Sequence, residues 1–512
     1  MTLRRANVPA ALALVPLCFL ALLLIAPLLR LLAEGGQLAP IALWHDDYLR
    51  WRVLWSFLQA TITCALGLLL GLPVAWVLAR FDFAGRGLVL RLLMLPFVVP
   101  TLVAALGVLA LFGPQSWLGR GLHLQGTPWL LLYGNLFFNL CLVVRAGVDA
   151  LAQVSATRLA AARSLGATPW RAFWRIEWPA IAPWIASAMC LVFLFCFAGF
   201  GLALVLGGQR YVTVEVEIYT LVAYELKLAE AGALALWMLL LVGSVALGYA
   251  FIEKRLATPA RSDGLALRRP HGPWQWAAVA AVLMLLALVC AAPLAAIVWR
   301  ALMAGPAAWS VLLEADTRAA LWNTLRFSGA ALLLATLLGV LHALAARHAL
   351  VLRALAFLPF VVSPVMVAFG LLLLYPRWTA SLPLLVAAYA LLAYPFVAKS
   401  LAAALDSLPA QWQQAACTLG ASPWSVFWRV TLPLVAPALR RGMAFAAATA
   451  VGEFAVTLFL SRPEWTTLTT LIYQRLGRPG AANVDAAMVL ASALMVFALI
   501  TFVLIDRPAR HA

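Results

Sequence analysis

Long apolar stretches separated by short polar ones dominate this chain. A helix that crosses a bilayer needs roughly 20 mostly apolar residues, and about twelve stretches come close to or meet that length. The pattern therefore predicts an all-α integral membrane protein with about twelve transmembrane helices. The expected spans are 8–32, 53–79, 88–112, 129–144, 181–206 and 231–252, followed by 276–299, 320–345, 352–375, 382–398, 434–460 and 487–505.

The chain also repeats itself. A more polar stretch at 160–179 recurs at 414–433, displaced by 254 residues (414 − 160), and the apolar run LPFVV at 95–99 recurs at 358–362. Each copy holds an even number of expected spans, so the two six-helix repeats should be parallel and related by an axis along the membrane normal. The expected domains are a first permease repeat at 1–255, a cytoplasmic linker at 256–272 and a second repeat at 273–512.

Prolines and basic residues refine this picture. The paired prolines of the stretches 95–100 and 358–364 remove backbone donors. They predict either a bend whose freed carbonyls are satisfied by neighbours or a cavity, or a simple packing kink. Lys and Arg collect on the cytoplasmic side of membrane proteins. With the N-terminus inside, the inner segments hold most of the arginines, from Arg4 to Arg175, whereas the outer loop 207–230 holds four glutamates. Both termini and both polar repeats are therefore expected in the cytoplasm.

Composition agrees with a membrane protein. Hydrophobic residues make up 65% of the chain and charged residues 11%, and the mean hydropathy is +0.99, far from soluble averages of roughly 25% charged residues. The net charge of +17 follows from the topology rule, so no nucleic-acid partner is expected. Six of the seven cysteines lie inside apolar runs and none forms a CxxC pair, so neither disulfides nor a metal site are expected.

Each copy of the polar repeat predicts a helix, a glycine turn and a second helix. Gly166 ends the first helix, since glycine reaches left-handed backbone angles without steric cost, and Thr168 with Pro169 begins the second as N-cap and first residue. Gly420, Ser422 and Pro423 do the same in the second copy. Helical spacing gives the second helix one aromatic face, which fits either a groove on a partner protein or the membrane interface. Its residues are Trp170, Phe173 and Trp174, and Trp424, Phe427 and Trp428.

These residues resemble the EAA loop of ABC importer permeases, a pattern of Glu-Ala-Ala, three residues, Gly, nine residues and Ile-x-Leu-Pro. Both copies lack the glutamate, which is Ala160 in one and Gln414 in the other. In that family the loop contains a coupling helix that fits into a groove on the ATP-hydrolysing subunit. The matching residues are Ala161, Ala162, Gly166, Ile176 and Pro179 near 158–180, and Ala415, Ala416, Gly420, Leu432 and Pro433 near 412–434.

The chain has no nucleotide-binding motif of its own. A phosphate-binding P-loop needs Gly-Lys followed by Ser or Thr, and glycine precedes none of Lys227, Lys254 and Lys399. The protein is therefore expected to be a non-enzymatic subunit without cofactors. The resemblance implies an ATPase dimer on the cytoplasmic face, which would carry ATP and Mg, and a periplasmic substrate-binding protein, with the permease in the bacterial inner membrane.

The resemblance extends to a substrate class. Along nearly the whole chain the sequence is similar to fused permeases of thiamine and thiamine pyrophosphate importers, and fused ferric-iron permeases share the same layout and an Arg462-Pro463-Glu464 stretch. Thiamine is the favoured substrate and ferric iron the alternative. The segments that carry the first resemblance are 137–139, 195–197 with Phe200, 206–208, 217–219, 453–454, 467–468 and 473–474.

A carboxylate inside an apolar span suggests function. Glu453, beside Phe454, would offer a passing cation such as a thiazolium both a charge and a ring face. The alternative is that Glu453 pairs internally with an Arg or a hydroxyl. Phe197 and Phe200 complete the expected substrate path.

Two other protein classes share part of this pattern. A secondary transporter of the 6+6 kind also has parallel halves and a cytoplasmic linker, and Gly85-Arg86-Gly87 faintly resembles its basic loop motif, but that class does not explain the doubled polar repeat. A membrane enzyme lacks any clustered catalytic set in this sequence.

Overall fold

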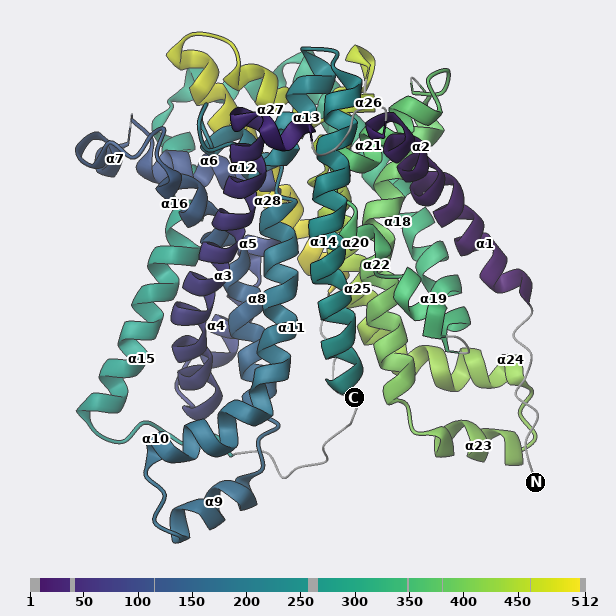
Figure 1. The fold of residues 1–512 in the computed structure, drawn as a ribbon. Coiled ribbons are helices and arrows are strands. Elements are labelled where there is room, and N and C mark those ends of the chain that lie inside the picture. Colours follow the sequence, from purple (N-terminus) through teal and green to yellow (C-terminus); the bar gives the residue numbers. More distant parts are fainter. Residues whose placement is uncertain are drawn as a thin grey trace. The chain divides into compact units, whose positions relative to one another are not determined.

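The computed structural model describes residues 10–36, 42–114, 116–256, 266–347, 350–379, 381–460 and 462–506. Over these ranges the chain is helical, apart from connecting turns and an isolated bridge between Phe81 and Arg268 (Figure 1). Arg4 and most of the predicted linker 256–272 lie outside the described residues. The structure therefore has the all-α architecture that the apolar pattern predicts.

The described residues contain ten helical segments that are long and apolar enough to cross a membrane, or twelve if each of two bent pairs counts as one span. The duplicated, multi-span architecture predicted from the sequence is thus confirmed. The ten are Ala13–Gly35, Asp47–Arg80, Pro128–Leu151, Pro169–Phe197, Leu228–Gly248, Pro273–Met303, Ala315–Ala346, Leu382–Ser407, Trp424–Val451 and Ala481–Ile505.

The two bent pairs correct the predicted spans 88–112 and 352–375, which are not continuous helices. Arg86–Val98 meets Thr101–Phe112 at 104°, and Leu352–Val361 meets Pro364–Leu374 at 94°. Pro100 and Pro364 lie at the breaks and supply no N–H to continue the helix. At the second break the hydroxyl of Ser363 accepts a hydrogen bond of 3.1 Å from the Met366 amide and so begins the next helix.

The chain forms two compact units, which exchange the first helix of each sequence half. Unit 1 comprises the described residues among Met1–Gln37, Val98–Pro100 and Ala304–Ala512, and unit 2 those among Leu38–Phe97 and Thr101–Met303. The two units in space therefore differ from the sequence halves 1–255 and 273–512, which are the two copies of the repeat.

Unit 2 is built on α3, α8 and α11, with α15 packed against α3 and α16 against α6. Its helices are α3 (Asp47–Arg80), α4 (Arg86–Leu92), α5 (Leu95–Val98), α6 (Thr101–Phe112), α7 (Trp117–Leu122), α8 (Pro128–Leu151), α9 (Ala156–Ser164), α10 (Pro169–Ala172), η3 (Phe173–Glu177), α11 (Trp178–Phe197), α12 (Gly201–Leu206), α13 (Val214–Ala223), α14 (Leu228–Leu256), α15 (Pro273–Leu286), η4 (Ala287–Ala291) and α16 (Ala292–Met303), with η2 (Ala42–His45) before them.

Unit 1 is built on α18, α22 and α25, with α1 packed against α18 and α2 against α21. Its helices are α1 (Ala10–Leu20), η1 (Ala21–Ile25), α2 (Ala26–Gly35), α17 (Pro306–Trp309), η5 (Ser310–Leu313), α18 (Ala315–Ala346), α19 (Leu350–Leu355), α20 (Leu358–Val361), α21 (Pro364–Leu374), α22 (Leu382–Ser407), α23 (Ala410–Thr418), α24 (Pro423–Val426), η6 (Phe427–Thr431), α25 (Leu432–Val451), α26 (Ala455–Leu460), η7 (Pro463–Trp465), α27 (Leu468–Leu476) and α28 (Ala481–Ile505).

Close helix contacts give the register of the repeat in space. A Cβ on Gly71 would lie 2.8 Å from Val143 in unit 2, and a Cβ on Gly339 would lie 2.7 Å from Val397 in unit 1. Residues of α3 thus correspond to residues of α18 at +268 (339 − 71), and residues of α8 to residues of α22 at +254 (397 − 143). Side-chain bonds agree, because Ser56 accepts from the Val214 amide at 2.8 Å and Thr324, at +268, accepts from the Leu468 amide, at +254, at 2.9 Å.

Candidate functional site

The two polar repeats fold into the predicted glycine turns. Gly166 has φ +81° and Gly420 has φ +83°, both in the left-handed region. Beyond each glycine the chain folds back, and the amide of Ala167 donates to the carbonyl of Ala162 at 3.0 Å, as the amide of Ala421 does to the carbonyl of Ala416 at 3.1 Å. These bonds satisfy carbonyls that the helix end leaves without donors. The predicted helix end at each glycine is confirmed.

The second helix of each repeat begins as predicted but runs on further. Thr168 Oγ1 accepts from the Arg171 amide at 3.3 Å, and Ser422 Oγ accepts from the Ser425 amide at 3.3 Å. The helix then continues through a π-helical turn, η3 or η6, into the membrane-spanning helix α11 or α25. The expected short, separate second helix is therefore wrong, because no residue between Pro169 and Phe197 breaks the helix, and any motion of this segment passes directly into a span.

The aromatic residues of the second helix differ in exposure. Trp170 and Trp424 are 69% and 71% exposed, whereas Phe173 and Phe427 are half-buried. Each exposed tryptophan packs edge-on against Trp174 or Trp428, with ring centroids 5.5 Å apart. In each repeat the predicted aromatic face thus consists of two exposed tryptophans and one half-buried phenylalanine.

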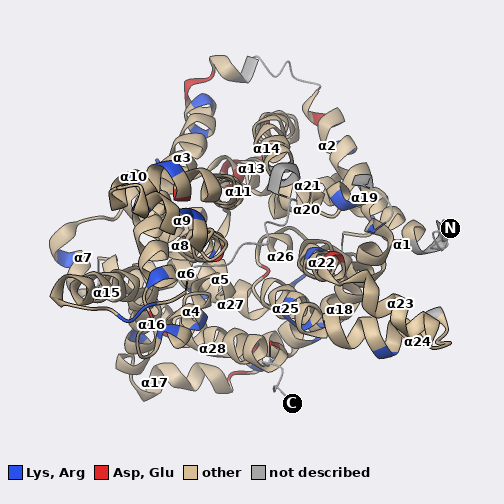
Figure 2. Ribbon diagram, turned by 90° about the horizontal axis from the view of Figure 1, so that it is seen from below, with Lys and Arg blue, Asp and Glu red and all other residues tan. Residues whose placement is uncertain are grey.

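Sequence reasoning missed two leucines of the same surface. Leu165 and Leu419, directly before the glycine turns, are 87% and 88% exposed. Their matched position in both copies of the repeat is a signal that was visible in the sequence. Basic residues lie in both repeats: α9 and α10 contain Arg158, Arg163 and Arg171, and η6, which continues α24, contains Arg429 (Figure 2). In Figure 1, α9 and α10 lie at one end of unit 2, and α23 and α24 at one end of unit 1.

The two repeats are anchored differently to the helices beneath them. In unit 2, Glu177 of η3 forms a buried ion pair with Arg80 at the end of α3, with 2.5 Å between Oε1 and Nη2. In unit 1 the corresponding residue, at +254, is the buried Thr431, whose hydroxyl accepts from Nε2 of Gln413 in α23 at 3.2 Å. The first anchor is charged and joins the repeat to a span, whereas the second is neutral and lies within the repeat.

The four residues predicted for the substrate path are buried, two in each unit. Phe200 packs edge-on against Tyr219 in unit 2, and Phe454 packs in the same way against Tyr473 in unit 1, with centroids 5.4 Å and 5.3 Å apart. The second pair repeats the first at +254. Phe197 stacks on Phe193 at the end of α11.

Glu453 lies in the break between α25 and α26, where Gly199 stands in the first repeat. Its Oε1 accepts from the Val456 amide at 2.9 Å and so begins α26. Its carbonyl accepts from the hydroxyl of Thr469 at 3.0 Å. The described residues give Glu453 no ion pair with an arginine. The partner of its carboxylate is a backbone amide, where the sequence suggested an arginine or a hydroxyl.

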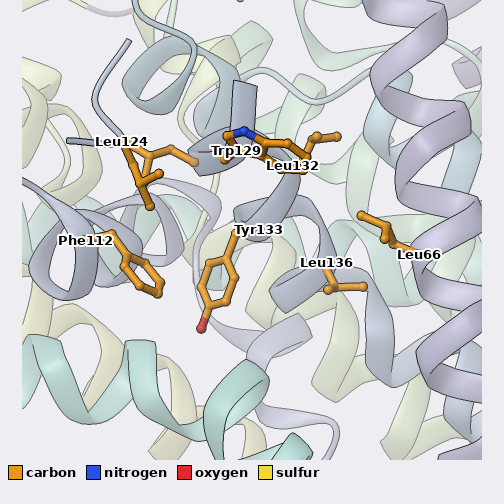
Figure 3. Close-up of a pocket in the computed structure, with 8 residues that line it drawn as sticks. Leu66, Phe112, Leu124, Trp129, Leu132, Tyr133 and Leu136 are labelled. Atoms are coloured by element: carbon orange, nitrogen blue, oxygen red, sulfur yellow. The ribbon is translucent and has the colours of Figure 1, made fainter. Parts of the chain in front are cut away.

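Two cavities distinguish the units. In unit 2 a cavity of about 230 Å³ is lined by apolar side chains, including Leu66, Leu136 and the edge-on pair Phe112 and Tyr133 (Figure 3). It contains no charged group and so suits apolar matter. In unit 1 a polar cavity of about 520 Å³ lies among the ends of α18, α26 and α27 and the loop around Glu464. Its size falls within the ordinary range of small-molecule sites.

Comparison with known proteins shows the family to which the chain belongs. Residues 67–258 and 331–506 match the family described as binding-protein-dependent transport system inner membrane component. The chain belongs to this family. It is a multi-pass permease component of the inner membrane, and ATP is bound by a separate ATPase subunit. This membership overturns the alternatives of a secondary transporter and a membrane enzyme.

Individual relatives agree along almost the entire length. The chain is 29% identical over 497 residues to the thiamine transport system permease protein ThiP of Escherichia coli, covering 90% of each chain. It is 30% identical over 526 residues to ThiP of Brucella abortus, covering 96% of this chain and 94% of the relative. The sulfate transport system permease protein CysT of Synechococcus elongatus is 29% identical over 201 residues, covering 37% of this chain and 72% of the relative.

Proposed function

We propose that this permease carries thiamine or thiamine pyrophosphate across the inner membrane, driven by ATP hydrolysis in a separate ATPase dimer. The observation that carries the substrate is the similarity to thiamine permeases along 90–96% of the chain. A periplasmic binding protein would deliver the solute, and both termini would lie in the cytoplasm, as the distribution of arginines suggests.

The two polar repeats are the proposed contacts with the ATPase dimer. Each presents an exposed leucine and tryptophan on a turn fixed by glycine, and apolar anchors of this kind fill pockets at interfaces. The described residues of both surfaces carry arginines, and the acidic Glu177 is buried, so an acidic rim would complement each. Since each second helix is continuous with α11 or α25, rotation of the ATPase would move a span.

The proposed solute path passes the break between α25 and α26. Glu453 and Phe454 lie there, and Phe197 and Phe200 lie at the corresponding break between α11 and α12. Breaks of this kind in membrane helices are tolerated where they line a cavity. A cation passing the break between α25 and α26 would meet the carboxylate of Glu453 and the ring of Phe454.

Uptake in vesicles tests the substrate. The chain would be co-expressed with its ATPase and binding protein, reconstituted, and supplied with ATP and labelled thiamine. We expect ATP-dependent uptake that thiamine pyrophosphate competes with and ferric iron does not. ATP-dependent uptake of iron in place of thiamine would keep the ABC permease and reject the thiamine proposal.

A further inference from the structure

A buried ionic cluster fills one position of unit 2 that is open in unit 1. In unit 2, Nε of Arg52 lies 3.1 Å from Oε2 of Glu217, and the Tyr48 hydroxyl donates to the same oxygen at 3.0 Å. Arg52 also donates to the carbonyls of Gln209 and Arg210, both at 2.9 Å. Arg52 and Glu217 are each 3% exposed, so they fill the space between α3, α13 and the loop before α13.

The repeat replaces this cluster by smaller or apolar residues in unit 1. By the register given above, Arg52 corresponds to Ala320 (52 + 268) and Glu217 to Leu471 (217 + 254). Tyr48 corresponds to Asp316 in the same way. All three counterparts line the polar cavity of about 520 Å³. The cavity therefore exists because α18 and α27 lack the side chains that fill the same position in the other unit.

The loop over the cavity is held by a different side chain from the one that holds the corresponding loop in unit 2. In unit 2 the guanidinium of Arg52 holds the loop carbonyls, whereas in unit 1 Nδ2 of Asn323 donates to the carbonyls of Glu464 and Thr466, both at 2.9 Å. Asn323 thereby uses both its donors and retains its amide oxygen as an acceptor. The side-chain amide of Asn323 thus holds the loop in place while the space beneath the loop stays open.

The lining carries charges of both signs. Asp316 and Glu464 are acidic, Arg462 and Arg478 are basic, and Gln474 adds an amide. A site for a simple cation would be expected to be acidic and a site for a simple anion basic. A lining with both signs matches a ligand that carries both.

We propose that this cavity binds a small organic cation that also carries a phosphate or pyrophosphate group, and that it is a solute site of unit 1 alone. The ligand's identity rests on the proposed function. Arg478 takes the phosphate and Asp316 the positive ring. The cavity also leads toward the proposed path. Thr457, which lines the cavity, lies one helical turn after Glu453, the residue that caps the start of α26.

The sharpest test restores the residues of unit 2. The double variant Ala320→Arg with Leu471→Glu supplies the ion pair that unit 2 buries at the corresponding position. Ala319 also lines the cavity and corresponds to Trp51 of α3 (51 + 268), so Ala319→Trp would fill the cavity without adding a charge. Arg318→Gln, exposed on the same helix but outside the lining, is the control. Binding of thiamine pyrophosphate, thiamine and inorganic pyrophosphate would be measured by calorimetry on the permease–ATPase complex in nanodiscs.

We expect the wild-type complex and Arg318→Gln to bind thiamine pyrophosphate about tenfold more tightly than thiamine. Each filling variant should weaken thiamine pyrophosphate at least tenfold. Arg478→Gln should bring thiamine pyrophosphate down to the affinity of thiamine and leave thiamine itself unchanged. Wild-type affinity in both filling variants, with intact ATPase activity as evidence of assembly, would overturn the inference, as would an absence of binding to the wild type.

Vesicle uptake separates this inference from the proposed function. If the wild-type complex takes up thiamine and the filling variants bind and transport normally, the proposed function stands and only the role of the cavity as a solute site is rejected. Saturable, variant-sensitive binding of thiamine pyrophosphate in a complex that imports only another solute would reject the transport substrate and support the cavity.

Discussion

The hydroxyl of Tyr133 donates a hydrogen bond of 2.7 Å to the carbonyl oxygen of Leu288. That oxygen has no helical donor, because the amide of Ala292 bonds to Ala287 in the π-turn η4 and the next residue, Pro293, has no N–H. The first helix of the chain repeats the arrangement. The amide of Ala26 bonds to Ala21, Pro27 follows, and Tyr375 donates to the freed carbonyl of Leu22 at 3.0 Å.

Tyr133→Phe is expected to lower the free energy of unfolding by about 1 kcal/mol, and Tyr375→Phe by a similar amount, since a carbonyl in hydrocarbon has no water to replace the lost donor. Thermal unfolding of the purified permease would measure both. Tyr224→Phe, at a side chain 67% exposed, is the control. Equal stability of all three variants would show that the freed carbonyls are satisfied otherwise.

Gly370→Ala is expected to disrupt the packing of α2 on α21. A Cβ at Gly370 would lie 2.8 Å from the carbonyl oxygen of Pro27, and a Cβ at Gly107 would lie 2.8 Å from that of Pro293. Overpacking of this kind costs about 1–3 kcal/mol. Gly329→Ala, in α18 with no atom within 4 Å, should cost nothing measurable in the same unfolding assay, and a loss as large there would contradict the packing argument.

Gly166→Val or Gly420→Val is expected to uncouple ATP hydrolysis from transport. Nothing lies within 4 Å of a Cβ at either site, so the substitution acts through the left-handed backbone alone, at a cost of about 1–2 kcal/mol or more. Transport per ATP hydrolysed should fall severalfold while the spans stay folded. Gly85→Val carries the same strain, at φ +88°, outside the polar repeats, and should leave that ratio unchanged; normal coupling in both repeat variants would reject the docking role.

Glu177→Gln is expected to destabilise the permease by about 3 kcal/mol, because it leaves the buried guanidinium of Arg80 without its counterion. Thr431→Val, at the corresponding residue, should cost about 1 kcal/mol, since it removes a neutral hydrogen bond. The yield of assembled complex and its unfolding midpoint would report both. Replacing Arg80 and Glu177 together by Met should recover most of the loss, and an equally unstable double variant would speak against the ion pair.

Glu453→Gln separates charge from helix capping. A glutamine oxygen still accepts the Val456 amide, so α26 and assembly should persist, whereas a passing cation loses its carboxylate. We expect thiamine uptake below saturation to fall about tenfold. Unchanged uptake, with Glu453→Ala impaired in assembly, would assign this carboxylate to capping alone.

Periodicity predicted the helical fold because roughly 20 apolar residues have few alternatives in a bilayer. Local chemistry also predicted the glycine turns and N-caps at Gly166 and Thr168, since these depend only on neighbouring residues. The right-angle breaks at Pro100 and Pro364 were visible only as prolines, because a proline specifies a missing donor but not the angle that packing then selects.

Long-range features lay beyond the sequence. The pairing of Arg80 with Glu177 joins residues from different helices, and neither has a spacing that indicates the other. The polar cavity results from an absence, the alanine at 320 where 52 is arginine, which becomes meaningful only after the spatial register of α3 and α18 is known.

The exchange of first helices sets the order in which the units can be completed during synthesis. Unit 2 has all its helices once Met303 has been made. Unit 1 begins with α1 and α2, and α2 must wait for α21, because 343 residues separate Pro27 from Gly370 (370 − 27). At about 5–20 residues per second, α2 spends roughly 17–70 s in the membrane without α21, the helix against which it finally packs.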